Sequence, residues 1–156
     1  MTTERPSSGM LIGGEDIKEP YDRFRDRVVF PITDLKDRVI AFGGRAMEKG
    51  VPAKYLNSPE TPLFHKGANL YCLDRARVAA TKDQPVIVAE GYMDVIALHG
   101  AGFTGAVAPL GTALTETQIE LLWRVAPEPI LCFDGDAAGQ RAVRALGAEG
   151  AVARIG

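Results

Sequence analysis

Three acidic residues follow apolar runs at positions where their side chains could share one site. Glu90 directly follows the run Val86–Ala89, and Asp134 and Asp136 follow the run Ile130–Phe133. If both runs are strands of one sheet, their ends lie about 5 Å apart as neighbours, or about 10 Å apart across one strand. Ligands of open parallel sheets bind beyond the carboxyl ends of the strands. The spacing therefore predicts that the three carboxylates converge.

Clustered carboxylates repel one another, and a hard divalent cation removes that cost. Oxygen ligands without His or Cys suit Mg²⁺ or Mn²⁺, and phosphoryl or nucleotidyl transfer is the chemistry that such a site favours. Asp94, one helical turn after Glu90, is a further candidate ligand. The alternative for Asp94 or Asp136 taken alone is a helix N-cap, because a carboxylate satisfies the free N–H groups of a first turn.

The second half of the chain alternates between strands and helices that would position these acids. The expected strands lie within residues 85–91, 105–111 and 129–136, each followed by a helix, over 93–99, 115–125 and about 137–146; a fourth strand is expected over 151–155. The strands are continuous apolar runs, as in a parallel sheet covered by helices on both faces. Thr115 and Gln118 form a capping box that marks the start of the second helix.

The first half has a different texture. Residues 28–32 and 38–42 are β-rich runs separated by a polar stretch, which predicts a hairpin whose second strand ends at Gly43 and Gly44. Residues 48–67 are rich in glycine and proline and are expected to be mostly loop, and a short helix is expected over 75–81.

The formal net charge of −2 conceals an uneven distribution of charge. Between Arg23 and Arg77 there are 11 basic and 6 acidic residues, whereas residues 79–156 carry 5 basic and 9 acidic ones. The simpler interpretation of each cation is a solvated surface charge. The apolar runs are too short to span a membrane, and two distant cysteines indicate a reducing, cytosolic location.

Two stretches of the second half carry a family resemblance. Residues 90–95 (EGYMDV) and 133–139 (FDGDAAG) resemble the two signature motifs of the Toprim domain, which primases, topoisomerases and some nucleases share. Five stretches upstream resemble the bacterial DnaG-type DNA primases: residues 21–28 (YDRFRDRV), 30–32 (FPI), 42–45 (FGGR), 54–61 (KYLNSPET) and 64–67 (FHKG). The likeness extends over about residues 10–156 in consistent order.

The resemblance implies an α/β fold in three segments. Residues 84–156 would form a Toprim-type (Rossmann-like) parallel sheet flanked by helices and truncated after its fourth strand. Residues 21–83 would form part of a mixed α+β basic subdomain with a β-hairpin, and residues 1–20 a partly ordered lead-in. The chain would then be a fragment of a primase polymerase core.

The resemblance also implies a function, namely DNA-templated synthesis of short RNA primers from ribonucleoside triphosphates. Asp134 and Asp136 would hold Mg²⁺ or Mn²⁺, Glu90 would act as general base or further ligand, and Asp94 would assist. Cations at the positions that match the family's basic ridge would contact the template strand and nucleotide phosphates; these are Arg23, Arg25, Arg45, Lys54 and Lys66.

The expected partners are single-stranded DNA, ribonucleoside triphosphates and the RNA–DNA hybrid product, in the cytoplasmic bacterial replisome. Zinc would belong to an amino-terminal domain that this chain lacks, and the replicative helicase to an absent carboxy-terminal domain. Two alternatives remain open. One is another Toprim enzyme, a topoisomerase or nuclease, and the other is a non-catalytic module that binds single-stranded DNA.

Overall fold

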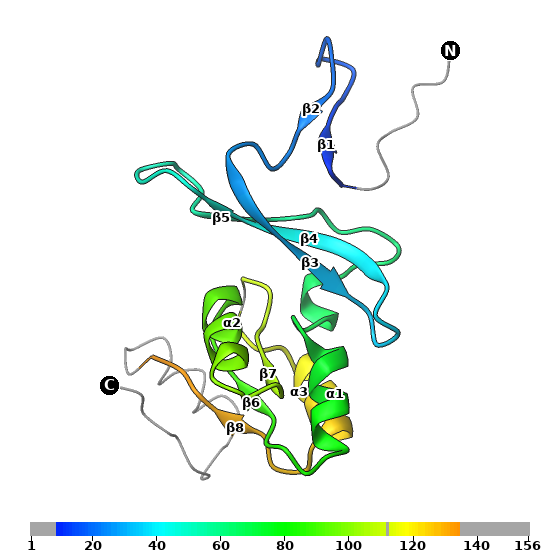
Figure 1. The fold of residues 1–156 in the computed structure, drawn as a ribbon. Coiled ribbons are helices and arrows are strands. Elements are labelled where there is room, and N and C mark those ends of the chain that lie inside the picture. Colours follow the sequence, from blue (N-terminus) through cyan, green and yellow to red (C-terminus); the bar gives the residue numbers. More distant parts are fainter. Residues whose placement is uncertain (1–8, 112, 135–156) are drawn as a thin grey trace.

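The antiparallel part of the molecule is formed by the first half of the chain (Figure 1). A computed structural model describes residues 9–111 and 113–134 of the 156 residues. A two-stranded antiparallel ribbon and a three-stranded antiparallel sheet, in the order β3-β4-β5, come first. Their strands are β1 (Leu11–Ile12), β2 (Tyr21–Asp22), β3 (Arg27–Thr33), β4 (Val39–Ala46) and β5 (Tyr55–Asn57). Within the expected lead-in 1–20, residues 11–12 therefore pair with β2.

The predicted hairpin is confirmed as β3 and β4, but the expectation that Gly43 and Gly44 end the second strand is wrong. β4 continues through both glycines to Ala46. A Cβ atom on Gly43 would overlap the ring of Tyr92, and one on Gly44 would lie 2.6 Å from Cδ1 of Phe24. The bare glycine backbone is needed because two aromatic rings pack onto the strand.

Residues 48–67 are mostly loop, as expected, but they include one short strand. Residues 55–57 form β5, which pairs with Gly43, Gly44 and Arg45 of β4. The pairing brings Tyr55 opposite Arg45 and Asn57 opposite Gly43. Part of the KYLNSPET stretch is thereby built into the sheet.

The parallel part begins after a short 3₁₀ helix, η1 (Lys66–Ala68) (Figure 1). Its strands are β6 (Ile87–Val88), β7 (Ala106–Val107) and β8 (Ile130–Leu131), and its helices are α1 (Leu73–Ala80), α2 (Tyr92–Gly100) and α3 (Glu116–Val125). The strand order is β7-β6-β8, and all pairs are parallel. The expected α/β fold is confirmed; the helix and strand expected over 137–146 and 151–155 lie outside the described residues.

Alternating residues of the central strand β6 face opposite sides of the parallel sheet. Ile87 belongs to one hydrophobic cluster with Val95 of α2, whereas Val88 belongs to a second cluster with Ala76 of α1 and Leu122 of α3. Both faces of β6 are therefore covered, which accounts for its continuous apolar sequence.

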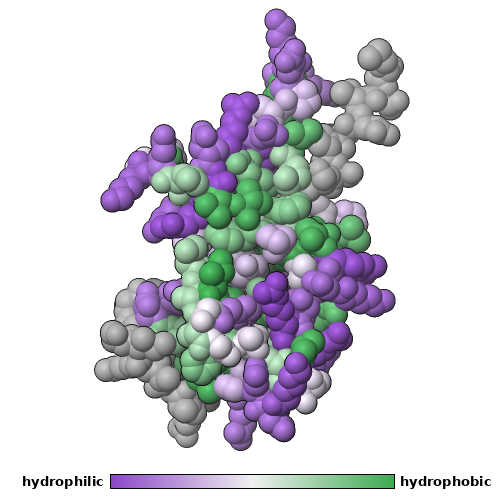
Figure 2. Space-filling model, in the orientation of Figure 1, coloured by the Kyte–Doolittle hydropathy of each residue, from purple (hydrophilic) through white to green (hydrophobic). Residues whose placement is uncertain are grey.

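One hydrophobic cluster continues from the parallel sheet into the antiparallel sheet. It contains Phe30 and Ile32 of β3 together with Tyr92 of α2, and Phe64 from the connecting segment. Figure 2 shows apolar surface across the middle of the molecule, with charged side chains extending on either side. No helix in the described part of the chain is long and apolar enough to cross a bilayer. The two sheets are thus held together by a shared core.

Candidate active site and nucleic-acid interface

Glu90 and Asp134 lie at the carboxyl ends of two neighbouring strands. β6 pairs directly with β8, with Val88 opposite Leu131. The backbone N–H of Asp134 donates a hydrogen bond of 3.0 Å to Oε1 of Glu90. Both residues are exposed at this edge of the sheet. The structure therefore brings together the first two acids of the predicted cluster.

Asp94 is not the N-cap that the alternative interpretation gave it, because Gly91 is the N-cap of α2; its carboxylate instead supports the helix start from the third helical position. It occupies the first turn of α2, and its Oδ2 accepts a hydrogen bond of 3.1 Å from the N–H of Gly91. The pKa of the Cys132 thiol is raised, first by burial and then by the negative charges of Asp94, Asp134 and Glu90. Asp136 lies outside the described residues.

Carboxylate oxygens are the donors that a hard divalent cation prefers, so the donor set of this cluster fits Mg²⁺ or Mn²⁺. Among residues 9–111 and 113–134, no three His, Cys, Asp or Glu side chains already stand close enough together to hold a metal. The pair Glu90 and Asp134 thus supplies part of the ligand set that the sequence predicts.

The predicted basic residues divide into those on the antiparallel part and Lys66, which begins η1. The side chain of Arg23 donates from Nε to the carbonyl of Asn57, at 3.1 Å. The guanidinium of Arg25 lies 4.6 Å from the ring centroid of Tyr21, within the range of a cation–π contact. Each of these two cations therefore contacts another residue of the antiparallel part.

Arg45 lies in the central strand β4, and Lys54 directly precedes β5. Nε of Arg45 is buried and has no hydrogen-bond partner within the described structure. Nζ of Lys54 lies 5.8 Å from the ring centroid of Tyr55, whose side chain is 43% exposed. Tyr55 could therefore stack on a base, whereas the rings of Phe64 and Tyr71 are buried in the core.

Two residues that the sequence did not single out connect the basic part to the acidic part. The hydroxyl of Tyr92 donates to Oδ1 of Asn57 at 2.6 Å, and Nδ2 of Asn57 donates to the carbonyl of Leu110 at 3.0 Å. The ring of Tyr92 stacks on Phe30 at 4.9 Å and meets Tyr71 edge-on at 4.7 Å. The sequence signal that could have identified Tyr92 was its position between the two candidate acids Glu90 and Asp94.

Comparison with known proteins assigns the two parts of the chain to two family models. Residues 2–77 match the DNA primase catalytic core, N-terminal domain, and residues 84–154 match the Toprim domain. The parallel sheet with its acidic strand ends is thus a Toprim domain. It follows a primase-type amino-terminal domain in the same chain.

Individual relatives narrow the assignment. A DNA primase of Pseudomonas putida is 54% identical over 140 residues, which are 89% of this chain and 21% of that protein. A solved DNA primase domain from Pseudomonas aeruginosa superposes with a TM-score of 0.80 at 52% identity, covering 88% of this chain and 43% of that one. A solved DnaG primase catalytic domain bound to ssDNA superposes with a TM-score of 0.79 at 48% sequence identity. The match covers 90% of this chain and 43% of that one.

The chain belongs to the DnaG-type DNA primase family, as the resemblance implied. It spans about a fifth of the length of the curated relatives that it matches. The match to the primase amino-terminal domain argues against a topoisomerase or nuclease among the Toprim enzymes.

Proposed function

We propose that this chain forms part of the catalytic core of an enzyme that synthesises short RNA primers on a DNA template from ribonucleoside triphosphates. The observation that carries the proposal is the pair of adjacent strand ends bearing Glu90 and Asp134, in one packed unit with the basic antiparallel part. Membership of the primase family supports the same reaction, nucleotidyl transfer.

The carboxylates would hold Mg²⁺ or Mn²⁺, with Glu90, Asp134 and Asp136 as ligands and Asp94 as an assisting acid. The cation, when bound, would neutralise the triphosphate and polarise the attacked phosphorus. Alternatively, Glu90 would accept the proton of the attacking hydroxyl as general base. The N–H of Asp134 fixes the Glu90 carboxylate in place for either role.

Arg23, Arg25, Arg45, Lys54 and Lys66 would contact template and nucleotide phosphates. The proposed partners are single-stranded DNA, ribonucleoside triphosphates and the RNA–DNA hybrid product. The replicative helicase would be reached through the full-length enzyme, in the bacterial cytoplasm. The ssDNA-bound DnaG catalytic domain of similar fold supports the assignment of the DNA partner.

Removal of divalent cations tests the proposed chemistry. We expect a chimera in which this chain replaces the matching segment of the P. aeruginosa primase, which is 54% identical, to incorporate ribonucleotides on single-stranded DNA. Chelation should abolish incorporation, and added Mg²⁺ or Mn²⁺ should restore it. A chimera that binds DNA equally with and without metal but never incorporates ribonucleotides would instead indicate the non-catalytic binding module.

Replacing Arg45 and Lys66 with alanine is expected to weaken binding of single-stranded DNA and flatten its salt dependence. Each lost phosphate contact lowers the slope of log K against log salt by about 0.7 for single strands. The measurement is a fluorescence-anisotropy titration at several salt concentrations. The matched control replaces Lys49 and Lys82, two exposed lysines outside the proposed set, and removes the same charge. An equal slope in both double variants would refute phosphate contact by Arg45 and Lys66.

A further inference from the structure

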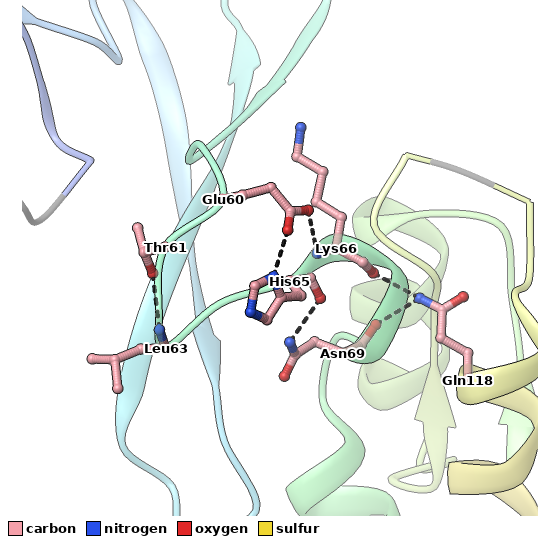
Figure 3. A network of polar contacts seen from close by, with 7 residues as sticks. All are labelled: Glu60, Thr61, Leu63, His65, Lys66, Asn69 and Gln118. Carbon is pink, nitrogen blue, oxygen red and sulfur yellow. Dashed lines mark hydrogen bonds and ion pairs between the residues drawn. The ribbon is translucent and has the colours of Figure 1, made fainter.

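The backbone of Lys66 is held from two sides, while its side chain extends away from the residues that hold it (Figure 3). Its N–H donates to Oε1 of Glu60 at 3.0 Å. Its carbonyl accepts a hydrogen bond of 2.9 Å from Nε2 of Gln118. Glu60 belongs to the segment that follows β5, whereas Gln118 belongs to α3 of the Toprim part. The start of η1 is therefore fastened to both parts of the molecule.

Gln118 is completely buried, and Figure 3 shows its side-chain amide bonded to two backbone carbonyls. Oε1 accepts from the N–H of Thr115, while Nε2 donates to the carbonyls of Lys66 and Asn69, the latter at 2.7 Å. The hydroxyl of Thr115 adds a bond of 2.6 Å to the carbonyl of Gly67. A buried amide that lost these partners would cost free energy, so separation of η1 from α3 is unfavourable. Gln118 therefore holds η1 against α3.

Glu60 uses both carboxylate oxygens on the same turn. Oε2 lies 2.6 Å from Nδ1 of His65, and since a carboxylate only accepts, Nδ1 carries the hydrogen. The N–H of Lys66 and the His65 ring lower the pKa of Glu60, so the carboxylate stays ionised. Nδ2 of Asn69 donates to the carbonyl of His65 at 2.8 Å and completes the network.

We propose that Glu60 and Gln118 are positioning residues that hold Lys66 in the orientation in which its ammonium meets a nucleic-acid phosphate. The inference rests on the proposed function, in which Lys66 contacts phosphate. A flexible lysine loses conformational freedom when it binds, and a backbone that is already fixed reduces this loss. Glu60 itself touches no phosphate in this arrangement; it acts through Lys66.

Whether truncation of Glu60 weakens or strengthens DNA binding distinguishes a positioning role from simple charge repulsion. A carboxylate near a phosphate-binding cation repels DNA, so removal of its charge alone should strengthen binding. If Glu60 holds Lys66, truncation should weaken binding instead. Glu60→Gln keeps an oxygen that can accept from the Lys66 N–H, so it should bind DNA at least as tightly as the unmodified chain.

The experiment measures the Kd of the full chain for a fluorescein-labelled oligo-dT strand at several salt concentrations. We expect Glu60→Ala to raise the Kd by about threefold or more, a change that loss of one held charged contact can produce. Glu60→Gln should restore tight binding. In a Lys66→Ala background, Glu60→Ala should cause no further weakening. Glu128→Ala, which removes an exposed acid from the α3–β8 connection, is the charge-matched control.

The outcomes distinguish the inference from the function on which it rests. If Lys66→Ala leaves both Kd and salt slope unchanged, Lys66 contacts no phosphate. The proposed phosphate contact and the proposed positioning role of Glu60 and Gln118 then both fail. If Lys66→Ala weakens binding but Glu60→Ala binds as tightly as Glu60→Gln, only the positioning role fails. Gln118→Met should also raise the Kd and speed hydrogen exchange of the Lys66 N–H. Since the Glu60 side chain is exposed, its variants test the proposal even if Gln118→Met does not fold.

Discussion

Tyr92→Ala is expected to lower the free energy of unfolding by about 3–5 kcal/mol, the range found when a large aromatic side chain is removed from a core. The ring is 95% buried between Phe30 and Tyr71, and it fills the space above Gly43. Because whole domains are stable by only about 5–15 kcal/mol, this variant should be close to unfolding at room temperature. Urea denaturation followed by circular dichroism measures the change.

The control for this prediction is Tyr92→Phe, which keeps the ring and removes only the hydroxyl. Burial raises the pKa of Tyr92, so the hydroxyl remains protonated and donates to Asn57 at neutral pH. Its loss should cost about 1 kcal/mol, typical of one hydrogen bond. Equal destabilisation by Ala and Phe would show that the ring contributes little to joining the two sheets.

Asp134→Asn is expected to reduce primer synthesis by the chimeric primase at least about a hundredfold, the loss typical when one group that stabilises transition-state charge is removed. The substitution is close to isosteric and leaves the N–H that binds Glu90 unaffected. It removes one of the negative charges that raise the pKa of the Cys132 thiol, so local repulsion falls and stability should not decrease. Activity and unfolding should therefore respond differently.

Ribonucleotide incorporation and urea denaturation of the same preparation check this result. Glu128→Gln removes one exposed carboxylate away from the strand ends and should leave synthesis unchanged. Undiminished synthesis by Asp134→Asn would refute the assignment of Asp134 to the catalytic site.

The strands and helices of the Toprim part were predictable because each is a local pattern. Continuous apolar runs indicated buried parallel strands, and the Thr115–Gln118 capping box marked the start of α3, where both reciprocal bonds are present. The convergence of Glu90 and Asp134 followed from their places at strand ends. The strand order β7-β6-β8 makes Glu90 and Asp134 neighbours. This order is set by packing over the whole domain, so no local sequence pattern predicts it.

The features of the antiparallel part that the sequence did not predict have a tertiary cause. Gly43 and Gly44 have low strand propensity, yet they lie within β4 because Tyr92 and Phe24, from distant parts of the chain, need the space. β5 lies among prolines and glycines and is short, so its pairing with β4 gave no periodic signal. The role of Gln118 beyond its capping box was hidden for the same reason, because its partners Lys66 and Asn69 lie about fifty positions earlier.

The boundary between the two family-model matches, near residues 78–83, is not a boundary between two separate hydrophobic cores. Phe30 and Ile32 from one side of it and Tyr92 and Val95 from the other occupy a single hydrophobic cluster. A protease that cut the chain at the exposed residues 81–85 would therefore leave two pieces that stay associated and melt in one transition. Evolution or engineering could not exchange either piece alone without also matching the aromatic surface of the other.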